Sequence, residues 1–398
     1  MLPSHLLIVA PSSDGHHPEY VRWIVDGALH YGAETVTVAG PTALVSSLNQ
    51  FSSPASLVSA LPLPEFDMLD DDTSLWRIGR RTQIAIQRAV DQVQPSEVLL
   101  SYLDHALLGL AIGLRFTIPV QISGILFRPT LHEPSPSGVK RSVRAMQKRI
   151  LLRLAAANPH LHRAFTLDPD AVDALRSHHI PATFLPDPVE PAQPSADRDT
   201  VRAHFEVEPS RQLAVLFGSL EERKGVFELM EALCELAPEQ ASALTVVIVG
   251  QTYDAIRPRL LDAIAHAQQH SKAQILFQEA FIPDTDLVNL TLAADLVLAP
   301  YKGHVGSSGV ILRASASGTP VLGPDTGLMH RDIVRHQLGV SVDTSNPTAI
   351  AGGLVRALNG EGFDPASAAA YAEAHSVDRF AETLFAPLSP QNAHEAST

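Results

Sequence analysis

Short apolar runs rich in Val, Ile and Leu alternate with helix-length segments along this chain. In the first half the strand-like runs are "HLLIVAP", "ETVTVAG", "SEVLLSYL" and "IPVQISGI". A strand that is apolar along its whole length is buried on both faces, which is typical of a parallel sheet covered by helices on each side. The pattern therefore predicts an α/β domain.

A proline-rich break, "FLPDPVEPAQPSADRDT" at 184–200, interrupts the alternation, which then starts again. The later strand-like runs are "RQLAVLFGSL", "ALTVVIVG", "QILFQEAFI", "ADLVLAPY" and "TPVLGP". We therefore expect two Rossmann-like domains facing each other across a cleft, with ligands bound outside the carboxyl ends of the strands. The expected limits are an N-terminal acceptor domain at 1–188, a linker at 189–200, a C-terminal nucleotide-sugar domain at 201–370, and a helix that packs back on the fold followed by a tail at 371–398.

Composition narrows the class of protein. A length of 398 residues with 45% hydrophobic and 18% charged residues fits a globular chain of two domains. The formal charge of −14 argues against nucleic-acid binding, because that binding depends on neutralising phosphates. The single Cys234 excludes a disulfide framework within the chain, and no apolar run reaches the roughly 18 residues of a membrane span. We expect a cytoplasmic protein without a signal peptide or transmembrane helix.

A glycine- and serine-rich loop opens the segment "YKGHVGSSGVILRASASGTPVLG" at 301–323. The free N–H groups and the positive end of the following helix dipole would form an anion site. We expect a diphosphate to bind at Gly306, Ser307, Ser308 and Gly309. The alternative is an ordinary strand-to-helix turn with a serine cap.

Five segments of the second half follow one another in a recognisable order. They are "LFGSLEERKGVFELMEAL", "VVIVG", "FIPDTDLVNLTLAADLVLAPY", "GHVGSSGVILRASASGTPVLG" and "HSVDRFAETL". In this order they resemble the nucleotide-sugar domain of retaining glycosyltransferase family four, which has the GT-B fold. The resemblance covers residues 211 to 385 and holds for the first half mainly in pattern.

The resemblance implies a hexosyltransferase of glycan biosynthesis that moves a sugar from a nucleotide-diphosphate donor to an acceptor hydroxyl with retention of configuration. It implies a nucleotide sugar as co-substrate, no cofactor and no metal. The acceptor could be a glycan, a lipid-linked molecule or a small molecule.

Several charged groups of that family are absent here. Its two loop glutamates align with Val305 and Arg313, and the arginine of its G-R-L motif aligns with Ser219. The histidine after its fourth strand aligns with Ser123. These departures keep open a non-catalytic protein that binds a nucleotide, a glycan or a partner subunit. A third alternative is a nucleotide-sugar epimerase of similar fold.

The lysine of the G-R-L segment is retained as Lys224, and we expect it, with Arg223, to stabilise the leaving diphosphate. Cations at a helix start oppose the helix dipole, which favours a functional role over a solvated pair. Ser219 would lie on the donor side of the same loop. The resemblance places the nucleotide base against the backbone of Phe281, Ile282 and Pro283.

Arg313 is the sharpest departure, because arginine only donates hydrogen bonds and a glutamate there would accept them from ribose. Three explanations remain. Arg313 could contact a phosphate or an acidic donor, it could pair with a carboxylate such as Asp325, or donor binding could be degenerate. We favour the first, because Arg313 lies one helical turn beyond Gly309.

The loop "SSDGHHPEYVRW" after the first strand contains Gly15, His16 and His17. The resemblance places this loop near the diphosphate and the acceptor. We expect Gly15 to contact the donor, His16 to act in catalysis and His17 to face the acceptor. The alternative is a histidine that satisfies loop backbone groups.

Three further residues are candidates for acceptor contact. His105 follows a strand end in "YLDHALLG". Ser123 and Arg128 lie in "ISGILFRPTLH", which we expect to be a loop on the cleft side. Arg128 could hold an anionic acceptor or form a surface pair.

Acid pairs of the form D-x-D occur at 70–72, 168–170 and 284–286. They lie in turn-like stretches, and Asp284 is better interpreted as a helix cap. We predict no metal site.

The segment "VKRSVRAMQKRILLRLAA" at 139–156 concentrates basic residues. Its apolar residues Val143, Met146, Ile150 and Leu154 share one helical face. Such a helix could lie on anionic lipid at the inner face of the membrane, which would suit a lipid-linked acceptor. The alternative is a helix that packs this face on the core and exposes its cations.

Overall fold

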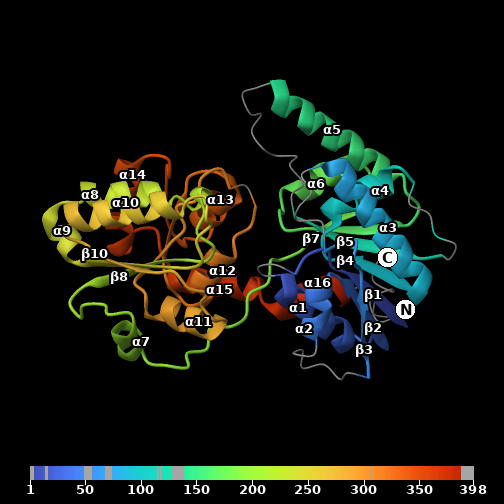
Figure 1. The fold of residues 1–398 in the computed structure, drawn as a ribbon, viewed down its shortest axis with the longest axis horizontal. Coiled ribbons are helices and arrows are strands. Elements are labelled where there is room, and N and C mark those ends of the chain that lie inside the picture. Colours follow the sequence, from blue (N-terminus) through green and yellow to red (C-terminus); the bar gives the residue numbers. More distant parts are fainter. Residues whose placement is uncertain are drawn as a thin grey trace. The chain divides into compact units, whose positions relative to one another are not determined.

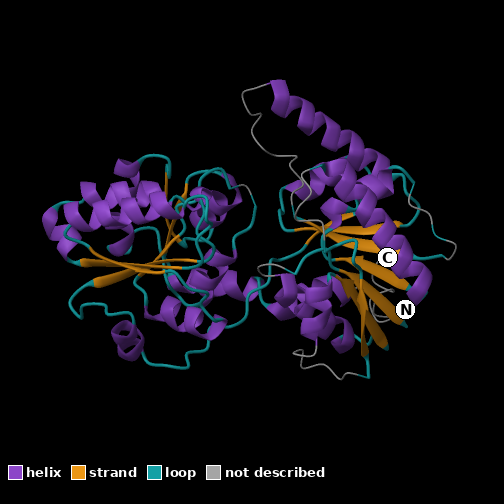
Figure 2. Cartoon of the chain, viewed as in Figure 1, coloured by secondary structure: helices purple, strands orange, loops and turns teal. Residues whose placement is uncertain are grey.

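The computed structural model describes residues 4–13, 17–48, 56–67, 74–113, 116, 119–127, 139–304 and 306–386 (Figure 1). The chain forms two compact units. The first consists of Met1–Pro186 together with Val377–Thr398, and the second is Asp187–Ser376. In each unit, helices cover both faces of a parallel sheet (Figure 2). The prediction of two Rossmann-like α/β domains is confirmed.

The first unit contains a seven-stranded sheet in the order β3-β2-β1-β4-β5-β6-β7. Its strands are β1 (His5–Val9), β2 (Thr35–Gly40), β3 (Val58–Pro62), β4 (Glu97–Leu100), β5 (Gln121–Leu126), β6 (Leu161–Thr166) and β7 (Ala182–Phe184). The order of the strands reverses between β1 and β4, and ligands of such sheets bind at the carboxyl ends of the strands beside that point.

Alternate residues of β1 face two separate cores. Leu7 and Val9 pack in one core, and Leu6 and Ile8 pack in the other. The first core is covered by α3 (Leu75–Val93), α4 (Leu107–Ala111), α5 (Val139–Ala156) and α6 (Ala171–Ser177). The second is covered by α1 (His17–His30), α2 (Thr42–Ser47) and α16 (Val377–Phe385). A short 3₁₀ helix, η2 (Leu103–His105), follows β4.

The second unit contains a six-stranded sheet in the order β10-β9-β8-β11-β12-β13. Its strands are β8 (Gln212–Phe217), β9 (Leu244–Val249), β10 (Gln274–Gln278), β11 (Leu296–Leu298), β12 (Val321–Pro324) and β13 (Gly339–Val342). The strand order reverses between β8 and β11, so the corresponding ligand position of this unit lies after those two strands.

The helices of the second unit again divide between two cores, except that no described side chain of α7 or η3 belongs to either core. They are α7 (Arg198–His204), η3 (Glu222–Lys224), α8 (Val226–Glu235), α9 (Pro238–Ser242), α10 (Arg257–His270), α11 (Asp284–Ala293), α12 (Gly309–Ala316), α13 (Gly327–Arg335), α14 (Pro347–Leu358) and α15 (Pro365–Ala374).

The segment expected to be one terminal helix is two helices. α15 belongs to the second unit, and α16 packs against α1 of the first. The contact with α1 is close, since a Cβ added at Gly27 would lie 2.8 Å from the Cβ of Ala381. The chain therefore returns to its first unit at the end.

Residues 189–200, expected to form a linker, belong by their contacts to the second unit. Asp197 caps α7 there, its side chain accepting a hydrogen bond from the Thr200 N–H at 2.9 Å. The remaining domain limits drawn from the sequence stay predictions. Within the described ranges, no helix combines the length and the hydropathy needed to cross a bilayer.

Candidate functional site

The loop after β8 positions Lys224 in the second unit. Lys224 ends the 3₁₀ helix η3, and its residue is only 8% exposed. Its Nζ donates a hydrogen bond of 2.5 Å to the phenolic oxygen of Tyr301, which follows the neighbouring strand β11, and lies 4.3 Å from the centre of that ring. A buried cation is therefore held at the carboxyl ends of the two strands where the strand order reverses.

Arg223 lies beside Lys224 but in a different environment. Its side chain is 46% exposed, and its guanidinium pairs with Glu221 at 2.6 Å. Ser219, at the start of the same loop, is exposed. Of the two expected cations, Lys224 is the one whose charge is shielded from water, so it is the stronger candidate to stabilise a diphosphate.

The loop before α12 contains the four residues expected to bind a diphosphate. Ser308 is the N-cap residue of α12 and is 8% exposed. Its side chain makes no capping hydrogen bond, and its hydroxyl is buried without a partner among the residues that the structure describes. A buried hydroxyl without a partner is costly unless something else binds it. The serine cap that we gave as the alternative explanation is therefore wrong.

The glycines that flank Ser307 and Ser308 are not required by the protein itself. Gly306 and Gly309 do not have positive φ angles. Among the described residues, a Cβ added at Gly309 would meet nothing within 4 Å, and one at Gly306 would meet only the His304 ring, at 3.9 Å. Their missing side chains leave open space at the start of α12, where a ligand could approach the backbone N–H groups.

Two side chains fix the conformation of this loop. Ser307 donates a hydrogen bond of 2.5 Å from its hydroxyl to the Asp187 carboxylate. His304 donates one of 2.9 Å from Nε2 to the Ser307 carbonyl. Ser307 is thus committed to Asp187, whereas the Ser308 hydroxyl has no partner within the described ranges. Val305, one of the departures, lies outside the described residues.

Arg313, on α12, forms an ion pair with Asp284 at 2.5 Å. A carboxylate pair was one of our three explanations for this arginine, although Asp325 was the example we named. Asp284 is the first residue of α11, and the N-cap is Pro283, so our interpretation of Asp284 as the helix cap is wrong.

Phe281, expected to frame the base, lies between β10 and α11 and is 75% exposed. An aromatic ring so exposed offers a flat apolar face to a ligand. Ile282 next to it packs on the core, and Pro283 begins the turn into α11.

Two expected acceptor-side histidines contact one tyrosine in the first unit. Tyr102 follows β4, and its ring centre lies 4.6 Å from that of His105 and 6.0 Å from that of His17, at the start of α1. Phe127, which follows β5, stacks on the Tyr102 ring, with the two ring centres 5.0 Å apart. The four rings gather after β1, β4 and β5, beside the point where the strand order of this sheet reverses.

Ser123 does not lie in a loop, so that prediction is wrong. It is the third residue of β5, is buried, and donates a hydrogen bond of 3.1 Å to the Glu97 carboxylate. Burial raises the pKa of Glu97, and Arg163 opposes this shift. A strand side chain committed in this way cannot reach an acceptor. Gly15, His16 and Arg128 lie outside the described residues.

The acid pairs fall at ordinary structural positions where they are described. Asp168 accepts a hydrogen bond from the backbone of Asp170 just before α6, and Asp284 and Asp286 are in the first turn of α11. The pair at 70–72 lies outside the described residues. The part of the chain that the structure describes contains no group of three or more His, Cys, Asp or Glu side chains that could hold a metal.

Sequence patterns did not reveal the residues that support the loop before α12. Asp187 lies 120 positions from Ser307, and its carbonyl accepts a hydrogen bond of 3.1 Å from Nδ1 of His375, which is 188 positions away. The His375 ring also packs against Tyr371, with ring centres 4.4 Å apart. No local motif predicts contacts between residues so distant in the sequence.

The burial of His375 beside Asp187 predicts that the fold is less stable in acid. Burial lowers the pKa of His375, while Asp187 partly opposes the shift. The neutral ring thus stabilises the fold fully above its ordinary pKa of 6.5, and this contribution is lost as the pH falls below that value and the unfolded chain takes up the proton. We expect the free energy of unfolding by urea to fall between pH 7.5 and pH 5.5 in the native chain. In His375→Gln it is expected to fall less, and the difference between the two proteins is at most about 1.4 kcal/mol per pH unit. Equal losses in the two proteins would contradict the assignment.

Comparison with known proteins adds independent findings. Residues 211–360 match the family described as Glycosyl transferases group 1. A D-inositol 3-phosphate glycosyltransferase of Jonesia denitrificans is 29% identical over 205 residues, which is 50% of this chain and 46% of that protein. The chain spans less than half the length of the curated relatives it matches.

Solved structures share the fold over nearly the whole chain. The trehalose-6-phosphate synthase OtsA superposes with a TM-score of 0.72 at 13% identity, covering 97% of this chain and 99% of that one. The HepE protein of Anabaena in complex with UDP superposes with a TM-score of 0.65 at 15% identity, covering 99% of each chain. The fold is therefore that of GT-B proteins.

Proposed function

We propose that this chain moves a hexose from a nucleotide-diphosphate donor to an acceptor hydroxyl with retention of configuration. The proposal starts from the match of residues 211–360 to the family described as Glycosyl transferases group 1. The relatives' names, which are those of glycosyltransferases, support sugar transfer.

One observation carries the proposal. The neighbouring strands β8 and β11 end beside the buried cation of Lys224, and the loop after β11 leads to the buried hydroxyl of Ser308 at the start of α12. A fixed cation, a free hydroxyl and the N–H groups of a helix start are the groups that bind a diphosphate. Gly306, Ser307 and Gly309 supply backbone to the same site.

The proposed reaction needs no nucleophile from the protein. The bond between the anomeric carbon and the diphosphate oxygen breaks, and the acceptor oxygen bonds to that carbon on the same face of the sugar. The acceptor's proton passes to the departing diphosphate oxygen, and Lys224 stabilises the negative charge that develops there. No metal or further cofactor takes part. Loss of the family's charged groups at 305 and 123 is compatible with this route.

The donor's nucleoside would bind near β10 and α12. The exposed ring of Phe281 would stack on the base. Arg313 only donates hydrogen bonds, but its partner Asp284 accepts them, so the pair would offer the ribose a carboxylate that Arg313 alone lacks. UDP is the first nucleotide to test, because the HepE structure was determined with UDP.

The acceptor would bind to the first unit near Tyr102, His17 and His105. We retain Gly15, His16 and Arg128 of the neighbouring loops in this proposal. The acceptor could be a glycan, a lipid-linked molecule or a small molecule. The curated relatives named for D-inositol 3-phosphate make a phosphorylated polyol the first acceptor to try.

The ion pair between Arg313 and Asp284 also favours a second function, because it places a cation where related enzymes have an acidic side chain. A non-catalytic protein would bind a nucleotide or a glycan without turnover.

A panel of nucleotide sugars, each offered with phosphorylated polyols and simple glycosides, separates the two functions. Transfer is expected to release nucleoside diphosphate only when an acceptor is present, and NMR of the product is expected to show the anomeric configuration of the donor. Nucleotide binding without release across the panel would overturn the transferase proposal and support the binding protein. Altered donor sugar without an acceptor would instead identify an epimerase.

A further inference from the structure

Large apolar side chains are exposed together on one helical layer of the first unit. α3, α4 and α5 lie side by side, with α4 in contact with both of the others (Figure 1). We call these three helices, with the C-cap residue of α4, the α3–α5 layer. Of the eleven large apolar residues exposed in the described chain, six belong to it. They are Trp76, Ile84, Ile112, Met146, Ile150 and Leu154.

On α5 the exposed apolar residues form a stripe. Met146, Ile150 and Leu154 follow one another at intervals of four and are 56%, 51% and 51% exposed. The core face of α5 is a different one, made by the fully buried Leu152 and Ala155. The alternative that this apolar stripe packs on the core is therefore wrong for these three residues. The side chain of Val143 lies outside the described part of the helix.

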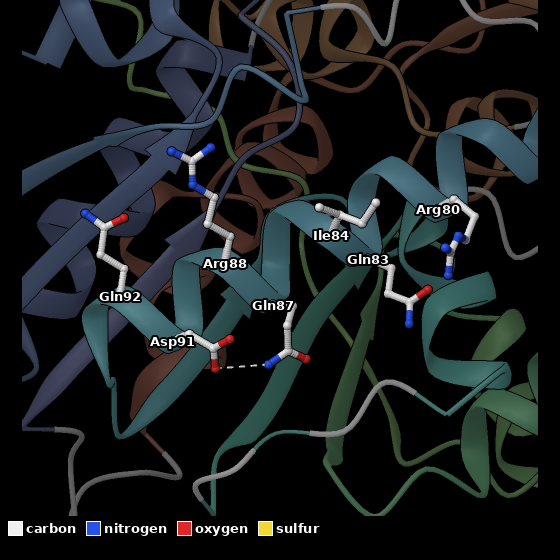
Figure 3. A pocket seen from close by; sticks show the side chains of 7 residues that line it. All are labelled: Arg80, Gln83, Ile84, Gln87, Arg88, Asp91 and Gln92. Atoms are coloured by element: carbon white, nitrogen blue, oxygen red, sulfur yellow. Dashed lines mark hydrogen bonds between the residues drawn. The ribbon is translucent and has the colours of Figure 1, made fainter.

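α3 repeats the arrangement. Trp76 is 59% exposed and Ile84 is 49% exposed, and the exposed Arg80 and Arg88 alternate with them at intervals of four. Figure 3 shows the shallow hollow along this helix, with Ile84 between Arg80 and Arg88. The hollow is lined by α3 alone, so it is a surface feature and not an enclosed ligand site.

The charge of the layer is opposite to that of the whole chain. α3 and α5 together contain ten Lys and Arg residues and one acidic residue, Asp91, whereas the chain carries a formal charge of −14. On α5 the exposed Arg149 and Arg153 each precede a residue of the apolar stripe. Cations that border an exposed apolar stripe match an anionic surface with an apolar interior.

We propose that the α3–α5 layer binds to the surface of a membrane that contains anionic lipids. The apolar stripe enters the boundary between headgroups and acyl chains, and the arginines remain with the lipid phosphates. None of these helices is suited to cross the bilayer, so the contact is interfacial. The inference rests on the first unit alone and does not depend on sugar transfer.

Trp76 provides an intrinsic reporter for this contact. The chain has two tryptophans, and the other, Trp23, is buried in α1. Adding vesicles of equal parts phosphatidylglycerol and phosphatidylcholine to the full chain is expected to shift tryptophan emission to shorter wavelength and to bring the protein down with the vesicles. Pure phosphatidylcholine is expected to bind at least tenfold more weakly, and added salt is expected to release the protein.

Two variants test the two parts of the surface. Met146→Ser, Ile150→Ser and Leu154→Ser together are expected to weaken partitioning at least tenfold. Arg149→Glu with Arg153→Glu is expected to weaken it more than tenfold, because each cation near the surface contributes roughly fivefold. The matched control is Val334→Ser with Leu261→Ser, which alters exposed apolar residues of the second unit and is expected to leave binding unchanged. Far-UV circular dichroism checks that each variant is folded.

Several results would overturn the proposal. Absence of binding to the anionic vesicles would do so, as would binding that the Arg149 and Arg153 variant retains in full. A native chain that is a dimer by sedimentation velocity, and becomes a monomer when the stripe is replaced, would show that the layer binds a second copy of the chain. Should the triple serine variant fail to fold, the charge-reversal variant still decides the matter, since Arg149 and Arg153 are exposed.

Discussion

Lys224→Met is expected to lower the turnover number for sugar transfer by about 100- to 1,000-fold, the usual effect of removing one group that stabilises developing charge in an active site. Lys224 is shielded from water and hydrogen-bonded to Tyr301, so its charge acts at short range with little screening. The measurement is the initial rate of nucleoside diphosphate release with the donor and acceptor found in the panel.

Arg223→Ala is the matched control for this prediction. Arg223 is the residue before Lys224 in the same loop, but it is half-exposed and already paired with Glu221. We expect its loss to change the rate less than about fivefold, as for most surface ion pairs. A large loss in Arg223→Ala with little change in Lys224→Met would contradict the assignment. A melting curve of each variant separates loss of chemistry from loss of structure, because Lys224→Met leaves the buried Tyr301 hydroxyl without its donor.

Gly225→Ala is expected to destabilise the second unit by about 3–5 kcal/mol, the combined cost of a left-handed backbone and of overpacking. Gly225 has a φ of 69°, and an added Cβ would lie 1.9 Å from the carbonyl oxygen of Pro300. That oxygen belongs to the backbone of the segment after β11, so it cannot move away without disturbing the sheet. The change would also displace Lys224, the residue before it. Chemical denaturation monitored by far-UV circular dichroism gives the free energy of unfolding.

Gly303→Ala separates the two contributions. Gly303 has nearly the same φ, 62°, but an added Cβ there would meet no described atom within 4 Å. Its substitution is expected to cost only the left-handed backbone term, about 1–2 kcal/mol. If both variants were destabilised equally, the close approach to Pro300 would not be the cause.

The sheets could be predicted from the sequence wherever a strand is apolar on both faces. The fully buried β9 and β4 are examples, since each is a run of residues that fit only the middle of a covered sheet. β3 and β7 were missed because they lie at the edges of their sheet and are short or largely exposed. β6 was missed because it contains Arg163, a charged residue within the sheet. Burial lowers the pKa of Arg163, and the nearby Glu97 opposes that shift.

The candidate site likewise has parts that the sequence could predict and parts that it could not. The places of Lys224 and of residues 306–309, in segments that follow β8 and β11, could be predicted because each lies within a short motif after a strand that could also be predicted. Their binding of a diphosphate stays a prediction. The residues that support that motif were not, because Asp187 contacts Ser307, and His375 contacts Asp187, only in the folded chain. Ser123 shows the opposite error. It was expected in a loop after a strand, but it lies within β5, and the pleat of that strand directs its side chain toward Glu97.

The position of α16 has a consequence for the order in which the protein is made. The second unit is one continuous stretch, whereas the first needs Phe380, Leu384 and Phe385 from the last helix to fill the core beside α1. On the ribosome the first unit must therefore wait, with that apolar surface uncovered, until the entire second unit has been synthesised. Nascent chains halted before residue 377 would expose an unfinished core in the half of the protein that was translated first.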